Sequence, residues 1–494
     1  MRNHFLCLSA GRLAILLGLL LAVFSISCDK RDAYGVPVGD TGLQSGINYM
    51  QPNKWEFSYR FKVDGIDSIK LLRDRNPSIF NPKSKVTGPG TFEIWFTGPI
   101  ESDEVRKVEL ISVTPEPTRI EFSEEDGKTW LYFDAAPDNR LPYQFEIEAT
   151  WSFYTFERYV YWKDLDVSRP YDKESELYKK YTREEYPLVF HAGLVKDASE
   201  CVDPGDPDNH FTTSLNIYNK IMSEYMYDYK HMFMIGLGEA GLIPTDRVWL
   251  NKRGICDEFA NIFVAMARSQ GIPARPCCGF AHMPIDDATR GLSDEEIEQL
   301  KDMKMNVNRT IGMPGGHAWA EFYLEGVGWI PLDATWGSNE MVIPSDLSPM
   351  GNRRNIPIAD YYFGKMDPYR ITLFKSWNYE LMPAPRTPDA DPIVPWMTMP
   401  SVRYSGVKDM IHGYDPTRDH PELARIAHLM PKETQSQLVW DMKNSRHRVV
   451  HIANPPQEEV KELIAQIESE GNHFVEVPMY KWDADRVETT LFSW

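Results

Sequence analysis

Residues 315–337 read Gly315-Gly-His-Ala-Trp-Ala-Glu-Phe-Tyr-Leu-Glu-Gly-Val-Gly-Trp-Ile-Pro-Leu-Asp-Ala-Thr-Trp-Gly337. Two alternating runs flank a glycine-containing turn, and this pattern predicts a β-hairpin. A three-residue loop centred on Glu325, with Gly326 in the left-handed conformation, makes His317 and Asp333 directly opposed on one face. A two-residue loop would place them on opposite faces, because a slip of one residue reverses every side chain.

A second informative stretch, Arg253-Gly-Ile-Cys-Asp-Glu-Phe-Ala260, lies upstream of the hairpin. Apolar residues recur at helical spacing from residue 259 to 267, which predicts a helix that ends at Gly271 and has Cys256 in its first turn. Backbone N–H groups and the positive end of the helix dipole favour a thiolate there, and the same N–H groups are candidate oxyanion donors. Asp257 and Glu258 oppose the thiolate, so we expect His317 to be its main activator.

Cys256, His317 and Asp333 together fill the three roles of a thiol-dependent catalytic triad, as nucleophile, base and orienting carboxylate. Taken one at a time, each residue has an ordinary structural explanation: a buried thiol, a strand histidine and a turn cap. The occurrence of all three in suitable local contexts favours the catalytic interpretation.

These two stretches, with Gly271-Ile-Pro-Ala-Arg275 between them, resemble the core of the transglutaminase-like superfamily, a branch of the papain-like cysteine enzymes, over roughly residues 210–345. The resemblance implies an α+β core with the nucleophile on a helix and the histidine and aspartate on neighbouring strands. It carries over to Cys256, His317 and Asp333. Papain-like proteases also have a glutamine shortly before the nucleophile, whereas this chain has Val248-Trp-Leu-Asn251.

Candidate substrate-binding residues follow from position relative to the predicted triad. Trp249 or Asn251 is a substitute for the missing oxyanion glutamine, and Trp319 and Trp336 are candidate walls of the cleft together with Trp329. Gly316 leaves an open approach to His317. We expect no cofactor and no metal site, since neither histidine clustering nor a dedicated calcium loop is present in the sequence.

The amino terminus predicts export. Residues 1–27 contain two arginines, an apolar run over residues 13–24 and small residues before Cys28, which is the pattern of a signal peptide. The apolar run is shorter than the roughly 20 residues that cross a bilayer. The ending resembles a bacterial lipobox, so we expect Cys28 to be lipidated and the protein to be anchored in the bacterial cell envelope. Ordinary cleavage and retention as an anchor are the alternatives.

The rest of the chain predicts further parts around an α+β core. From about residue 50 to 165 the sequence alternates with period two, which predicts an N-terminal β-sandwich over residues 28–165. Its aromatic residues either bind carbohydrate or only pack. Residues 166–208 read as a linker, residues 209–382 as the transglutaminase-like core, and residues 383–494 as a small C-terminal α/β subdomain with a β-α-β pattern. The polar insert at 286–308 is either a lid or a solvated excursion.

Charge and cysteine content narrow the functional classes. The net charge of −19 over 494 residues disfavours nucleic acid as a partner. Beyond Cys28 and Cys256, we expect Cys201, Cys277 and Cys278 to be buried, reduced thiols, with a disulfide from Cys201 as the alternative.

The expected activity is hydrolysis of an amide bond in a peptide, protein or glycopeptide through a thioester on Cys256. Acyl transfer to an amine uses the same three residues and is the nearest alternative. A non-catalytic surface lipoprotein that binds peptide or glycan is the alternative from a different functional class.

Overall fold

The computed structural model describes residues 43–63, 85–86, 92–124, 127–134, 145–162, 165–236, 243–283, 312–338, 358–384, 393–394, 401–404, 407–408, 445–452, 455–476 and 486–491. The predicted signal peptide, Cys28 and the insert at 286–308 lie outside these residues. The chain has a mixed α+β fold, which confirms the predicted fold class.

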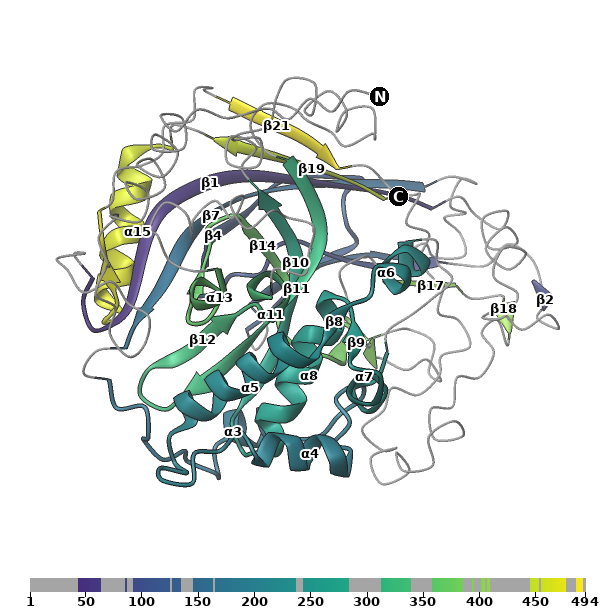
Figure 1. Ribbon diagram of the computed structural model, residues 1–494. Helices are drawn as coiled ribbons and strands as arrows, with labels where there is room; N and C mark the ends of the chain where they lie inside the picture. The colour runs from purple at the N-terminus through teal and green to yellow at the C-terminus, as the bar shows by residue number, and fades with distance from the viewer. Residues whose placement is uncertain are drawn as a thin grey trace, which may run out of the picture. The chain divides into compact units, whose positions relative to one another are not determined.

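The largest sheet is built around a long first strand that lies between β7 and β19 (Figure 1). Alternate residues of this strand, Trp55, Phe57, Tyr59 and Phe61, are buried, which is the period-two pattern of the sequence. The strands of this sheet are β1 (Gly46–Val63), β4 (Val105–Thr114), β7 (Phe145–Tyr161), β13 (Lys365–Met366), β19 (Ser445–Ile452), β20 (His473–Phe474) and β21 (Arg486–Leu491).

A second sheet packs against the first through aromatic rings. Phe96 stacks on Tyr59 with ring centroids 4.8 Å apart and on Trp151 at 5.8 Å, so side chains from the two sheets interdigitate. Its strands, in spatial order, are β17 (Ser401–Tyr404), β3 (Phe92–Thr97), β6 (Lys128–Asp134) and β5 (Arg119–Ser123). Aromatic residues of this region therefore pack in the core. The predicted division into a sandwich, a linker and a core remains a prediction.

The expectation of a separate C-terminal subdomain was wrong for the strands that the structure describes. β19 pairs antiparallel with β1, and β20 pairs parallel with β1, so both add to the sheet formed by the N-terminal segment. The physical reason is that the edge of β1 carries unpaired backbone groups, which are satisfied by another strand. The pattern strand, helix, strand is present, but its two strands run in opposite directions and do not pair with each other.

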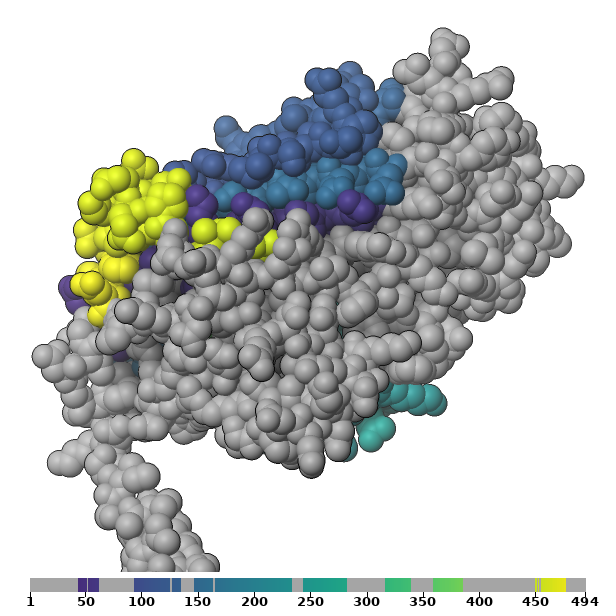
Figure 2. Space-filling view, turned by 90° about the horizontal axis from the view of Figure 1, so that it is seen from above, coloured from purple at the N-terminus to yellow at the C-terminus, as the bar shows by residue number. Residues whose placement is uncertain are grey.

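Helix α15 (Gln457–Ser469) is fastened to the same sheet by ion pairs and hydrogen bonds. Glu459 binds Lys54 at 2.8 Å and accepts a hydrogen bond from the Tyr154 hydroxyl at 2.6 Å. Glu470, just after the helix, binds Arg106 at 2.7 Å. Figure 2 shows this helix beside the strands of the N-terminal segment.

The predicted catalytic segment forms a four-stranded sheet with helices beside it. Helix α8 packs against β10 and β11 through Phe259, Phe263 and neighbouring apolar residues (Figure 1). The strands, in spatial order, are β12 (Gly328–Leu332), β11 (Gly312–Leu324), β10 (Ala274–Met283) and β14 (Arg370–Phe374). The helices are α3 (Glu176–Thr182), α4 (Ala192–Ser199), α5 (His210–Glu224), α6 (Tyr229–Gly236), α7 (Thr245–Asn251), α8 (Cys256–Ser269), α11 (Ala334–Gly337) and α13 (Ile358–Tyr361).

Short two-stranded pairs complete the described elements. They are β8 (Met226–Tyr227) with β9 (Arg253–Gly254), β15 (Tyr379–Glu380) with β16 (Ile393–Val394), and β18 (Val407–Lys408) with β2 (Lys85–Val86). Helices α3 and α4 lie within the segment that the sequence indicated as a linker, and both contact α8. Cys201, Cys277 and Cys278 are buried free thiols, as expected.

A glycine on β10 allows three strands of the catalytic sheet to lie side by side. Gly279 is opposite His317 on β11 and opposite Thr372 on β14. A Cβ atom added at this position would lie 1.8 Å from the carbonyl oxygen of Ile371, which belongs to the backbone of β14. Only glycine therefore permits this approach of β14.

We predict that Gly279→Ala destabilises the protein by about 1–3 kcal/mol, because the new methyl group must push β14 away from β10. The midpoint of urea unfolding measures this change. The matched control is Gly316→Ala on β11, where nothing lies within 4 Å of an added Cβ atom. A G279A protein as stable as the control would contradict the close approach.

Candidate active site

Cys256 is the first residue of α8, as the sequence predicted. The helix start is capped by Glu258, which is fully buried. Its carboxylate accepts hydrogen bonds from the backbone N–H groups of Ile255 at 2.8 Å and Ile243 at 3.1 Å. Glu258 is thus an internal helix cap.

The surroundings of Cys256 oppose ionisation of the thiol. Burial raises its pKa well above the usual value, and the carboxylates of Asp257 and Glu258 raise the pKa further. The Asp257 Oδ1 atom lies 4.0 Å from the sulfur. The backbone N–H of Ala318 acts in the opposite direction and lowers the pKa, which places the sulfur against β11 next to His317. A thiolate here needs a base or cation from nearby.

His317 and Asp333 meet, but in a different register from the predicted one. The hairpin loop is centred on Gly326, and Ala320 is opposite Leu332. The prediction that His317 is directly opposite Asp333 was therefore wrong by two residues. Gly326 has φ +78°, the left-handed conformation expected of it. A shift of two residues keeps every side chain on its face. Nε2 of His317 lies 2.7 Å from Oδ2 of Asp333.

Asp333 is the last residue before α11 and is completely buried. Its Oδ1 atom accepts the backbone N–H of Trp336 at 2.9 Å, and its own N–H donates to the carbonyl of Tyr362. Burial alone would raise the pKa of Asp333, but His317 and Arg370 together lower it to about 2. An ionised carboxylate only accepts hydrogen bonds, so Nε2 of His317 carries the proton and Nδ1 is the basic nitrogen.

Arg370 is a site residue that sequence reasoning missed. Its Nη1 atom lies 2.7 Å from Oδ2 of Asp333, and its Nε donates to Asp367 at 3.0 Å. Burial opposes the charge of Arg370, but the two carboxylates raise its pKa above the usual value. All five residues of the strand that contains it, β14, are buried. A single cation in a buried strand signals a buried acid opposite it.

Two of the predicted tryptophans lie beside His317. The ring of Trp336 is 5.0 Å from the imidazole, and that of Trp319 is 6.2 Å away. Trp319 is 2% exposed and packs against Cys277 and Met366, so it belongs to the hydrophobic core beside His317. Trp336 is partly exposed as a residue, although its indole nitrogen is buried and has no hydrogen-bond partner among the described residues. It is therefore the better candidate for contact with a substrate.

The remaining candidate residues have other surroundings. Trp249 donates its indole N–H to Asp197 on α4 at 2.8 Å and stacks on His191 at 4.7 Å, so its ring joins α7 to α4. Asn251 is exposed at the end of α7. Gly316 is exposed on β11, just before His317, in keeping with an open approach. The oxyanion role of Trp249 or Asn251 stays a prediction.

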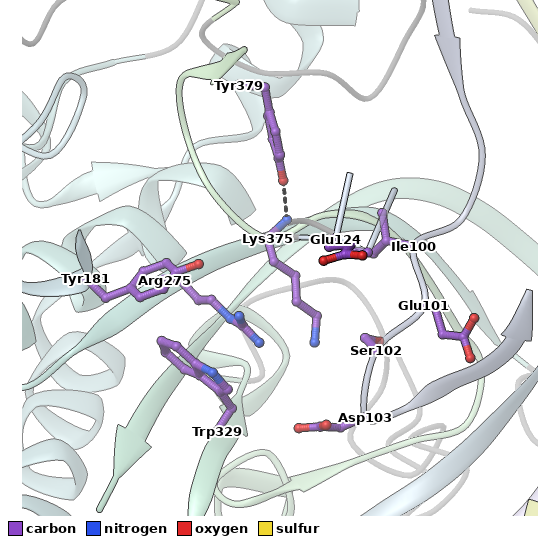
Figure 3. A pocket seen from close by; sticks show the side chains of 11 residues that line it. Ile100, Glu101, Ser102, Asp103, Glu124, Tyr181, Arg275, Trp329, Lys375 and Tyr379 are labelled. Atoms are coloured by element: carbon purple, nitrogen blue, oxygen red, sulfur yellow. Dashed lines mark hydrogen bonds between the residues drawn. The ribbon is translucent and has the colours of Figure 1, made fainter. Parts of the chain in front are cut away.

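Trp329 lies in a separate cavity of about 260 Å³ (Figure 3). Arg275 stacks on its ring at 3.8 Å, and Lys375 and Tyr181 line the same space. Trp319 packs against Cys277 and Met366. It lies on β11 between His317 and Glu321, and Glu321 binds Arg275. Cys256, His317 and Asp333 are not among the residues that line this cavity.

Among the described residues, no group of three or more histidine, cysteine or acidic side chains is placed to hold a metal ion. The described residues include the side-chain types that acyl transfer uses: a thiol at the start of α8, and an imidazole in contact with a buried carboxylate.

Comparisons with known proteins place this segment. Residues 203–334 match the family model described as the transglutaminase-like superfamily. An uncharacterised protein of Haemophilus influenzae is 27% identical over 136 residues, which are 27% of this chain and 34% of that protein. The chain thus spans about a third of that relative's length.

Solved structures with partial similarity include a candidate cysteine protease from Cytophaga hutchinsonii, 18% identical, with 58% of this chain and 78% of that chain covered and a TM-score of 0.36. Red sea bream transglutaminase is 11% identical, with coverage of 75% and 66% and a TM-score of 0.25. The matched family segment contains Cys256, His317 and Asp333. Residues 203–334 are therefore the part of the chain that is similar to the transglutaminase-like superfamily.

Proposed function

We propose that the protein is a cysteine-dependent amide hydrolase that acts on a peptide, protein or glycopeptide through a thioester on Cys256. The observation that carries this proposal is the short contact between His317 and the buried, ionised Asp333. Because of that contact, Nδ1 of His317 is unprotonated and can act as the base. His317 is followed on β11 by Ala318, whose backbone N–H lies against the Cys256 sulfur.

The chemistry balances with these residues alone. Nδ1 of His317 takes the thiol proton, and the sulfur attacks the amide carbonyl carbon to form a C–S bond. The imidazolium returns the proton to the leaving nitrogen as the C–N bond breaks. Water, deprotonated by the same imidazole, then attacks the thioester carbonyl carbon and the C–S bond breaks to give a free carboxylic acid. The imidazolium returns its proton to the Cys256 sulfur, which restores the starting state. The partly exposed ring of Trp336 beside His317 supports this scheme as a candidate contact for the substrate.

We predict that iodoacetamide alkylates Cys256 at least about tenfold faster than Cys201, Cys277 or Cys278, because only Cys256 has a histidine base and a helix start. Mass spectrometry of tryptic peptides gives the four rates. His317→Ala should slow the labelling of Cys256 about tenfold, whereas His473→Ala, on β20, should leave it unchanged. Equal rates in wild type and H317A would rule out the base role.

A further prediction concerns Asp257. Burial and then Glu258 raise the pKa of Asp257 to about 7. Its negative charge therefore develops as the pH rises through 7, and it raises the pKa of the neighbouring thiol. We expect Asp257→Asn to accelerate alkylation of Cys256 several-fold at pH 8, because the repulsion between the Asp257 carboxylate and the thiolate is lost. The acceleration should be smaller at pH 6.

The control for Asp257→Asn is Glu458→Gln on α15, an exposed carboxylate that should not change the rate at either pH. If D257N labels no faster than wild type at pH 8, the carboxylate does not restrain the nucleophile.

Hydrolysis and transfer differ only in the acceptor, and the exposed Gly316 just before His317 favours an open groove that admits water. We predict that a glutamine-containing peptide incubated with a fluorescent primary amine yields more free acid than labelled peptide, as measured by liquid chromatography. The Cys256→Ala protein serves as the control and should yield neither. Incorporation of amine in excess of acid would assign the protein as a transferase.

We also propose that Cys28 is lipidated and anchors the protein in the bacterial cell envelope, on the sequence pattern of residues 1–28. Among the described residues, no helix has the length and apolar character needed to cross a membrane. The formal charge of −19 supports a proposal that nucleic acid is not a partner.

Lipidation predicts that the protein incorporates labelled palmitate in a bacterial host and sediments with membranes. Cys28→Ala should abolish the labelling, while Cys201→Ala should leave it intact. Labelling that persists in C28A would place the lipid elsewhere or exclude it.

A further inference from the structure

A row of alternating charges extends from the imidazole into the protein interior. His317 contacts Asp333 at 2.7 Å, Asp333 contacts Arg370 at 2.7 Å, and Arg370 contacts Asp367 at 3.0 Å. Asp367 is itself fixed by the backbone N–H of Tyr369 at 3.0 Å. All four charged or polar side chains are at most 5% exposed.

The guanidinium of Arg370 is also held on its faces by aromatic rings. Its Cζ atom lies 4.5 Å from the ring centroid of Trp336, 5.1 Å from Trp319 and 5.4 Å from Tyr362. The same Trp336 and Trp319 rings flank His317. Arg370 therefore has one orientation, set by a carboxylate on its Nε side and by stacked rings.

Stability alone is a poor reason for an arginine at this position. The Nη2 atom of Arg370 is buried and has no hydrogen-bond partner among the described residues. Replacing a buried ion pair by apolar residues is often neutral or stabilising, so an incompletely bonded arginine is costly as a purely structural element. The unfavourable burial of the Arg370 guanidinium is explained if Arg370 is needed to keep Asp333 ionised and in place.

We propose that Arg370 is a positioning residue of the active site: it holds the Asp333 carboxylate ionised and aimed at Nε2 of His317, and so fixes which imidazole nitrogen is the base. This inference rests on the proposed function and extends the site to β14, beyond the family match at residues 203–334. Gly279 lets β14 approach β10 closely enough for this contact.

The pH behaviour follows from the groups that surround Asp333. These are His317 from β11, Arg370 from β14, Cys256 from α8 and Tyr218 from α5. Burial raises the pKa of Asp333, and His317 and Arg370 lower it. Without Arg370, the Asp333 carboxylate binds a proton at a higher pH and no longer accepts the hydrogen bond from Nε2 of His317. Either nitrogen of the imidazole can then carry the proton. Activity should then fall on the acid side at a higher pH than in the wild type.

The test compares wild type with Arg370→Gln, Arg370→Lys and the matched control Arg268→Gln. Arg268 is another buried arginine, which binds Glu185 at 2.8 Å away from the triad. Nitrogen-15 NMR of histidine-labelled protein reports the tautomer of His317, assigned by its loss in His317→Asn. The pH dependence of Cys256 alkylation and of peptide hydrolysis is measured on the same samples.

We expect wild type and R268Q to keep His317 as a single tautomer with Nε2 protonated. R370Q should show a mixture, a rate of hydrolysis lower by about tenfold to hundredfold at pH 7, and an acid limb moved upward. R370K, which keeps the charge but loses the planar fork, should recover part of both effects. If R370Q fails to fold, Asp367→Asn, which removes the anchor of Arg370, should shift the tautomer and the acid limb in the same direction.

A single Nε2-protonated tautomer and an unshifted acid limb in R370Q, or in D367N where it replaces R370Q, would overturn the positioning role. The tautomer signal does not depend on turnover. A wild-type protein that shows the fixed tautomer but neither alkylation nor hydrolysis would therefore refute the proposed hydrolase while leaving the role of Arg370 intact.

Discussion

The buried negative charge of Asp333 is the constraint around which this site is organised. A carboxylate with no exposure needs compensation from every side. It receives a hydrogen bond from the backbone of Trp336, a contact from His317 and an ion pair with Arg370. Each comes from a different element, so the end of β12, the start of α11, and strands β11 and β14 must all be in place. The geometry of His317 is in this sense a property of the whole sheet.

A second group of buried charges joins the catalytic sheet to the N-terminal strands. Glu321 on β11 binds Arg275 at 2.7 Å and Lys375 at 2.9 Å, and Lys375 binds Glu104 at 2.8 Å. Burial opposes the charge of Glu321, but the two cations lower its pKa below the usual range. Since Glu104 lies just before β4, this ion pair reaches from one sheet to the other. The cavity in Figure 3 borders this group of charges.

Local patterns in the sequence predicted the parts of the site that depend on short stretches of chain. The start of α8 at Cys256, the glycine turn at Gly326 and the shared face of His317 and Asp333 all follow from nearby residues. The exact register of the hairpin did not follow from nearby residues. Loops centred on Glu325 and on Gly326 differ by a shift of two residues, which leaves every side chain on the same face. Arg370 was missed because its partner acid is distant along the chain, and only the three-dimensional packing of β14 brings them together.

The same limit explains the error at the C-terminal end. Strand, helix and strand were visible as local patterns, but the choice of partner strand is a long-range property that periodicity does not contain. Trp249 was a similar case: its place before the nucleophile suggested the cleft, whereas its indole is bound to Asp197 on α4.

The pairing of β19 with β1 has a consequence for how the chain acquires its structure. During synthesis β1 is made early, and the strand that covers its edge over residues 54–61 emerges only after nearly all the other elements. Until then, the nascent protein has an open sheet edge rich in aromatic residues, which is a template for wrong association. Contacts of such high sequence separation also slow folding. A ribosome that stops short of residue 445 would release a chain with its triad complete in sequence but its central sheet unfinished.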